Sequence, residues 1–152
     1  MPFTTVAPRK LASQLFLRDQ NNMYENRQEG TLASGAASAT YPMGRLVFRV
    51  IGTTDAAWTP VTNIGTECVI ANEFAILAGD RTEIFADVVH TTGTASKIIY
   101  FSDRVTLDKK AFRDLNTVIA SDGNMATVAT LLQRQQIVFH ERAADYTSPY
   151  EV

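Results

Sequence analysis

Cysteine and histidine are scarce in this chain of 152 residues, whose complement is Cys68, His90 and His140. A single cysteine excludes an intramolecular disulfide framework and a cysteine-cluster metal site. The two histidines lie far apart in the sequence, and neither has a cysteine or grouped carboxylates near it at the spacing of metal ligands. We therefore predict that the protein holds no metal and no cofactor.

Long apolar runs and a strong charge of one sign are missing as well. The apolar runs fall far short of the ~20 residues that cross a bilayer, and no charged-then-apolar secretory signal opens the chain. The 14 basic and 16 acidic residues leave a net charge of −2, which gives no bulk attraction for nucleic acid. We expect a soluble protein, made in the cytoplasm, with neither membrane nor nucleic acid as a partner.

Catalytic motifs are also absent from the sequence. It has no nucleophile elbow, no phosphate-binding loop with its second glycine and lysine, and no dinucleotide fingerprint. The segment 93–97 has the residue types of a phosphate loop but no helix after it, so a hairpin is favoured. Asp80, Glu83 and Asp87 are candidates for a cation site. In a strand, positions 83 and 87 would share a face but position 80 would not, so we favour solvated side chains at a sheet edge. We predict that the protein is not an enzyme.

The first forty residues predict an extended N-terminal arm and linker. Isolated apolar residues are followed by a small, polar, Gly-containing stretch at 33–40 that lacks anchoring side chains. A frayed terminus with one helical turn packed on the domain is the alternative interpretation. The apolar residues that we expect to bind a partner are Phe3, Val6, Leu11, Leu15 and Phe16.

From Gly44 the sequence becomes typical of β-structure. A composition of 45% hydrophobic against 20% charged residues can form one packed domain. Hydroxyl and glycine residues at 90–96 suit a hairpin loop, and the strand spacing favours a largely antiparallel sheet or barrel. Cys68 is expected to be a small buried side chain within a strand, and Trp58 to cover one end of the core. The strands are expected at 45–51, 67–70, 73–77, 83–89 and 97–101.

Late in the chain the apolar period changes from strand to helix. Asp108 is a plausible N-cap for a helix that continues to 122–123, and Asn124 for a second helix that ends near Gln135. A final strand is expected at 137–139. The predicted fold class is therefore mainly β with minor α, with a core at 41–140. The buried helix positions are expected to be Phe112, Leu115, Val118, Ile119, Met125, Val128, Leu131 and Leu132.

The tail at 141–152 has no apolar period of its own. It contains Tyr146, Pro149 and Tyr150, and aromatic side chains without a core around them favour burial against a partner. We predict that these three residues contact a neighbouring subunit.

Three segments in this order resemble the head decoration, or cement, proteins of tailed bacteriophages of the lambda type. They are the turn at 42–44 with the strand that ends at Gly52, the apolar run at 73–80, and the helix-to-strand element at 128–139. The resemblance covers roughly residues 41 to 139. It implies a compact β-rich domain with a little helix, preceded by an arm.

The resemblance also implies a function. A decoration protein binds the outer surface of the mature phage head, bridges subunits of the major capsid protein and stabilises the shell against internal DNA pressure, as a homotrimer at local threefold positions. The localisation expected is the outer surface of the virion. Two alternatives stay open at this stage: a small β-barrel that binds a ligand or catalyses a reaction, and another minor virion protein of the tail or connector.

Overall fold

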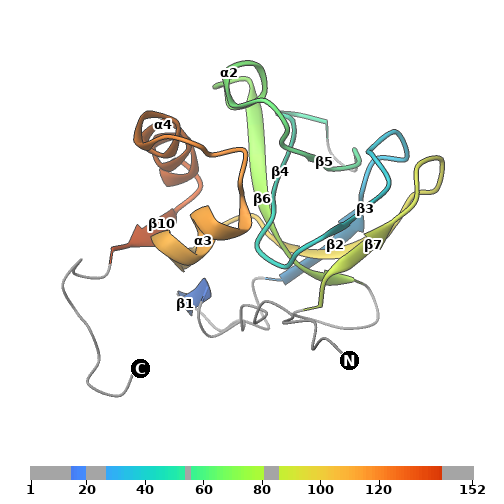
Figure 1. Ribbon diagram of the computed structural model, residues 1–152, viewed down its shortest axis with the longest axis horizontal. Coiled ribbons are helices and arrows are strands. Elements are labelled where there is room, and N and C mark those ends of the chain that lie inside the picture. Colours follow the sequence, from blue (N-terminus) through green and yellow to red (C-terminus); the bar gives the residue numbers. More distant parts are fainter. Residues whose placement is uncertain (1–14, 20–26, 54–55, 81–85, 142–152) are drawn as a thin grey trace, which may run out of the picture.

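The computed structural model describes residues 15–19, 27–53, 56–80 and 86–141 (Figure 1). It confirms a mainly β fold with short helices, and no helix in these ranges is long and apolar enough to span a bilayer. The elements in chain order are β1 (Phe16–Asp19), β2 (Arg27–Thr31), β3 (Ala39–Tyr41), β4 (Leu46–Val50), β5 (Thr59–Pro60), α2 (Ile64–Glu67), β6 (Asn72–Asp80), β7 (Val88–His90), β8 (Lys97–Phe101), β9 (Val105–Asp108), α3 (Lys109–Leu115), α4 (Asp122–Gln133) and β10 (Ile137–His140).

A five-stranded antiparallel sheet in the order β2-β8-β6-β4-β5 forms the central layer. Successive strand residues point to opposite faces. On β6, Phe74 and Ile76 accordingly enter one hydrophobic cluster, whereas Ala75 and Leu77 enter the other. Both faces of the sheet are therefore covered, which explains why β6 has almost no polar side chain between its ends.

The first cluster lies between this sheet and a layer made of β1, β9, β10 and the helices α3 and α4 (Figure 1). The order of the second sheet is β1-β9-β10, with β1 antiparallel and β10 parallel to β9. Parallel neighbours need a crossover, and α3 and α4 supply it. The apolar face predicted for α4 is confirmed, since Met125, Val128, Leu131 and Leu132 are buried.

The second cluster lies on the other face of the central sheet, where β3 and β7 form a two-stranded sheet. At the end of β2, the Trp58 N–H donates to the Thr31 carbonyl at 2.9 Å and the Ala33 N–H donates to the Trp58 carbonyl at 2.8 Å. These two bonds form a short parallel bridge between the residues that follow β2 and the residue that precedes β5. The bridge does not close the sheets into a barrel. Of the predicted alternatives, sheet or barrel, the structure has the sheet.

Two predicted strand features are wrong. Residues 64–67 form the short helix α2, and Cys68 is its C-terminal cap rather than a strand residue, because Asn63 caps the first turn. The loop at 90–96 does not close a hairpin either. It connects β7, which pairs with β3, to β8, which pairs with β2 and β6. Of the strand expected at 83–89, the positions 83–85 lie outside the described residues.

The expected linker before Tyr41 also needs correction. In the described part of that segment, β2 pairs along its whole length with β8, and Leu32 is fully buried. Leu15 and Phe16 belong to the first hydrophobic cluster. The boundary between arm and core therefore does not fall at residue 40, and positions 1–14 of the predicted arm lie outside the described residues.

The predicted turn at 42–44 is present and depends on its glycine. Arg45 N–H donates to the Pro42 carbonyl at 3.1 Å, and Gly44 has φ +94°, a left-handed conformation that favours glycine. A Cβ added at Gly44 would lie 2.5 Å from Leu15 Cδ2 and 2.8 Å from Leu115 Cδ1. The turn therefore packs directly against the N-terminal segment and α3.

The helix boundaries differ in part from the prediction. Asp108 is the N-cap of α3 as expected, accepting from the Ala111 N–H, but α3 ends at Leu115 instead of continuing to 122. The N-cap of α4 is Ser121 and not Asn124. The Ser121 hydroxyl accepts a hydrogen bond from the Asn124 N–H at 3.1 Å. The final strand predicted at 137–139 is confirmed by β10.

Candidate functional site

The histidines do not form a site together. His90 is buried at the end of β7, where its Nδ1 lies 2.8 Å from the Ser96 hydroxyl and its ring packs beside Tyr41. His140 is exposed at the end of β10, in a different sheet. Within the described ranges, no three histidine, cysteine, aspartate or glutamate side chains gather as metal ligands.

Of the three carboxylates considered for a cation site, Glu83 lies outside the described residues. Asp87 has a structural role, because its Oδ1 accepts the backbone N–H of Met43 at 3.1 Å. This bond ties the chain before β7 to the turn before β4. The carboxylate therefore positions a turn that already depends on Gly44.

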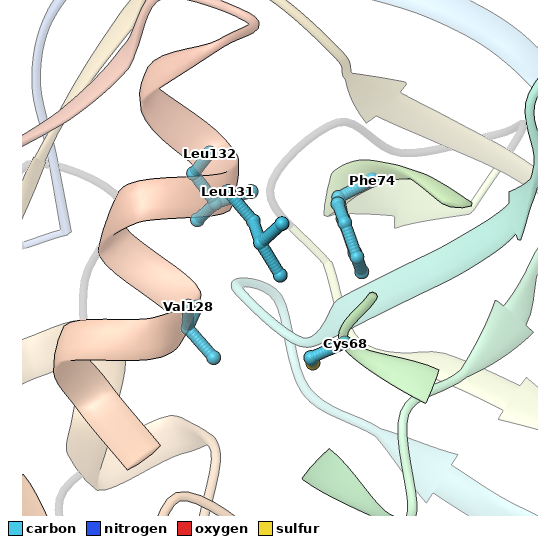
Figure 2. Close-up of a pocket in the computed structure, with 5 residues that line it drawn as sticks. All are labelled: Cys68, Phe74, Val128, Leu131 and Leu132. Carbon is cyan, nitrogen blue, oxygen red and sulfur yellow. The ribbon is translucent and has the colours of Figure 1, made fainter. Parts of the chain in front are cut away.

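Cys68 lines a small apolar crevice between α4 and β6 (Figure 2). The other lining residues are Phe74, Val128, Leu131 and Leu132, and the crevice has no room for a water-sized molecule. Pockets for small-molecule ligands usually measure roughly 300–1,000 Å³ and contain a few polar groups. This crevice has neither the size nor the polarity of a ligand site, so it is a packing defect beside a buried thiol.

The thiol of Cys68 is expected to be inert in the folded protein. Burial, together with the nearby Glu67 carboxylate, raises its pKa to about 11 from 9.0. At pH 8 a chromogenic thiol reagent should therefore modify the protein only after a denaturant is added. The absorbance of the coloured group that the reagent releases on reaction would measure the modification. Above pH 9 the unfolded thiol ionises before the folded one, so this group's contribution to stability should fall as pH approaches 11. Rapid modification of the native protein at pH 8 would contradict this assignment.

Trp58 is buried rather than available to stack a ligand. Its side chain is 1% exposed, its ring packs 5.0 Å from that of Tyr100, and the Arg49 guanidinium lies 4.2 Å from its centroid. Gly30 makes room for this pair, since a Cβ there would lie 2.9 Å from Tyr100 Cε1. The prediction that Trp58 covers part of the β-core is confirmed.

One end of the β4–β6 ladder exposes aliphatic side chains instead of polar ones. Val50 is 54%, Ile51 52% and Ile70 75% exposed, and the Ile51 N–H donates to the carbonyl of Ala71 beside Ile70. We call Val50, Ile51 and Ile70 the tip patch. Exposed aliphatic residues that gather at one place mark binding surfaces more often than those scattered singly.

Arg134, at the end of α4, borders the tip patch. Its guanidinium donates to the backbone carbonyls of Ile70 and Asn72, both at 3.1 Å. No carboxylate of the described residues pairs with it. The border of the patch therefore carries a positive charge that is fixed in position and that no carboxylate of the described ranges neutralises.

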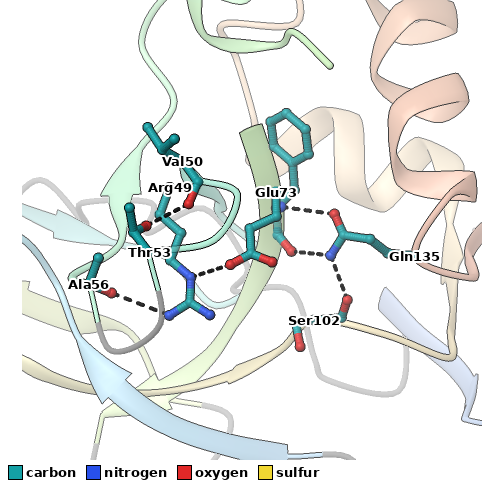
Figure 3. Close-up of polar contacts among 8 residues, drawn as sticks. Arg49, Val50, Thr53, Ala56, Glu73, Ser102 and Gln135 are labelled. Atoms are coloured by element: carbon teal, nitrogen blue, oxygen red, sulfur yellow. Dashed lines mark hydrogen bonds and ion pairs between the residues drawn. The ribbon is translucent and has the colours of Figure 1, made fainter. Parts of the chain in front are cut away.

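A polar network holds the backbone below the tip patch in place (Figure 3). The Arg49 side chain pairs with Glu73 on the neighbouring strand and donates to the Ala56 carbonyl at 3.3 Å. Gln135 accepts from the Phe74 N–H at 2.9 Å, and its amide nitrogen donates to the Phe74 and Ser102 carbonyls, both at 2.7 Å. The Gln135 amide thus makes the hydrogen bonds with Phe74 that a residue on a neighbouring strand would make. The tip patch therefore rests on a rigid support.

The sequence-predicted binding residues do not come together in the structure. Leu15 is fully buried and Phe16 is 5% exposed, so neither presents a surface to a partner, which corrects that prediction. The other six predicted residues lie outside the described ranges: Phe3, Val6, Leu11, Tyr146, Pro149 and Tyr150. The tip patch was not predicted from the sequence, although an apolar pair directly before the turn residue Gly52 was a usable signal.

No protein-family model, curated protein or solved structure matches this chain.

Proposed function

We propose that this chain is a non-enzymatic head decoration protein, which binds the outer surface of a tailed-phage capsid and bridges subunits of the major capsid protein. The observation that carries the proposal is the tip patch, three exposed aliphatic side chains on a rigidly supported sheet end. A preorganised apolar surface suits lasting association, because little ordering entropy is lost when a partner covers it.

The competing ligand-binding or catalytic interpretation has less support. The crevice beside Cys68 is small and apolar, and burial raises the pKa of its thiol, which disfavours a nucleophile. His90 is committed to Ser96 and buried. The described groups that most often carry chemistry thus serve packing and loop closure.

In the proposed assembly, shell binding depends on the segment before Leu15 and on the tip patch. Phe3, Val6 and Leu11 remain the candidate anchors of that segment. A homotrimer at local threefold positions would give each chain an equivalent neighbour and let three weak attachments act together. The protein would then be found on the outside of the virion.

The test starts from virions of the phage that encodes this chain, with and without its gene. We expect the protein in purified particles and, by electron cryomicroscopy, clustered at threefold positions on the outer surface. Particles without it should release DNA at a lower temperature, and added protein should restore resistance.

A variant that lacks residues 2–11 should bind such particles more than about a thousandfold more weakly, since three lost anchors at roughly 1.5 kcal/mol each amount to about 4.5 kcal/mol. Its thermal unfolding should match that of the parent. Val89→Ala, at an exposed position on β7, is the control for binding and folding. Particles that never contain the protein would refute the proposed function.

A further inference from the structure

β2 is an edge strand of the five-stranded sheet, because β8 pairs with one of its sides and no described strand pairs along the other. The backbone groups of successive residues alternate between the two sides of an antiparallel strand. The Leu32 N–H donates to the Ser96 carbonyl on the β8 side at 2.8 Å, whereas the Thr31 carbonyl accepts from the Trp58 N–H on the opposite side at 2.9 Å. Two residues before Thr31, the N–H and C=O of Glu29 therefore also point away from β8.

The open part of this edge is short and lies on the surface. Trp58 covers the edge from Thr31 onward, so the open part ends at Gly30. The side chains of residues 27–29 are exposed, and no group of the described ranges bonds the outward N–H or C=O of Glu29. Exposed edge strands can pair with another chain, and charged side chains are a usual protection against such pairing.

The charges of β2 do not protect it against a second copy of the same strand. Its first residues are Arg27, Gln28 and Glu29, so opposite charges lie two positions apart. When two copies of β2 run antiparallel about a two-fold axis at Gln28, Arg27 of each copy lies opposite Glu29 of the other. Opposite charges directly across a strand pair attract, whereas a register that places Glu29 opposite Glu29 repels.

We propose that β2 of one copy pairs antiparallel with β2 of a second copy, in an isologous two-fold contact centred on Gln28. The direction of the backbone groups agrees with this register. Positions 27 and 29 would form the hydrogen-bonded pairs, and the two Gln28 residues between them the non-hydrogen-bonded pair, with Cα atoms about 4.5 Å apart. The two five-stranded sheets then form one continuous sheet across the contact.

The contact is expected to be weak, because a ladder over residues 27–29 buries far less than the roughly 800 Å² per partner of a stable interface. It therefore forms at high local concentration. It goes beyond the proposed function, since it uses neither the tip patch nor a threefold axis. It concerns the free protein and can be tested without any capsid.

The test uses the full chain with Gln28→Cys. The two introduced thiols face each other across the two-fold axis, at a separation that a disulfide spans. Under mild oxidation at high protein concentration, a disulfide-linked dimer should form at least about tenfold faster than in Val89→Cys, because the contact holds the two thiols together. Val89 is the matched control, since it is 75% exposed but lies on β7. Non-reducing gel electrophoresis measures both rates, and the buried Cys68 is common to both proteins.

Charge reversal tests the register. Glu29→Arg, added to Gln28→Cys, should slow dimer formation to the rate of the control, because it places two positive side chains opposite each other. Adding Arg27→Glu as well restores opposite charges and should restore the rate. Circular dichroism checks that each variant is folded.

Two results would overturn the inference: a rate for Gln28→Cys no higher than that for Val89→Cys, or a rate that Glu29→Arg leaves unchanged. Both concern the free protein, so either can occur while the protein is still found on virions. If the dimer forms but the protein is missing from virions, the proposed function fails alone.

Discussion

Replacing Phe16 with alanine is expected to lower the free energy of unfolding by about 4 kcal/mol, the usual cost of removing a buried phenylalanine. The side chain is 5% exposed, its ring packs 5.1 Å from that of Phe101, and its backbone pairs with Leu107 on β9. Removing the ring would leave a cavity between the two sheets. Chemical denaturation followed by circular dichroism measures the change.

The matched control is Val89→Ala, which shortens an exposed aliphatic side chain and should change the stability by less than about 0.5 kcal/mol. The Phe16 result also decides between two views of the N-terminal region. If Phe16→Ala unfolds like the parent, this part of the chain is an adhesive arm and not a component of the core.

Asn116→Ala is expected to lower the free energy of unfolding by about 3 kcal/mol, because it leaves buried backbone groups without partners. The Asn116 side chain is fully buried. It accepts from the Leu46 N–H at 2.7 Å and donates to the carbonyls of Gly44 and Phe112, both at 2.9 Å. One amide thus joins the end of α3 to the start of β4.

Hydrogen exchange gives an independent reading of the same change. The amide of Leu46 should exchange much faster in Asn116→Ala than in the parent, at a denaturant concentration where both are folded. Asn124→Ala, on the neighbouring helix, is the control and should change the stability by less than about 0.5 kcal/mol. Equal stability of both variants would show that water replaces the amide without cost.

Elements whose signal lies within a few neighbouring residues could be predicted from the sequence. The spacing of Met125, Val128 and Leu131 defined a helix face, and Asp108 was a recognisable N-cap. The β-branched run that contains β4 was likewise sufficient. In these segments local preference and tertiary packing favour the same structure, so reading the chain locally was enough.

Features that depend on distant partners could not be predicted in this way. β2 has the polar sequence Arg27–Thr31, and only its pairing with β8 makes it a strand. Leu15 and Phe16 resembled exposed anchors because their neighbours in the core come from β8, β9 and the turn at Gly44. A prediction from local patterns therefore placed the boundary of the domain too late in the chain.

The candidate surface was missed for a related reason. Ile70 and Ile51 resemble ordinary core residues in the sequence, and their exposure follows from lying just beyond the last pair of the β4–β6 ladder, Val50 with Asn72. Asn116 and Gln135 gave no signal at all, since an asparagine or glutamine that replaces backbone partners has no characteristic spacing. Their roles become visible only when the segments they join are placed together.

The pairing of β1 with β9 has a consequence for the biosynthesis of this protein. A ribosome delivers Phe16 long before Leu107, and β2 long before its partner β8. The N-terminal strands therefore emerge without the segments that bury them, and they must wait until most of the chain has been translated. Contacts between such distant residues slow folding and prolong the exposure of apolar side chains. Folding of this domain is thus expected to finish only after β10 has left the ribosome and joins β9.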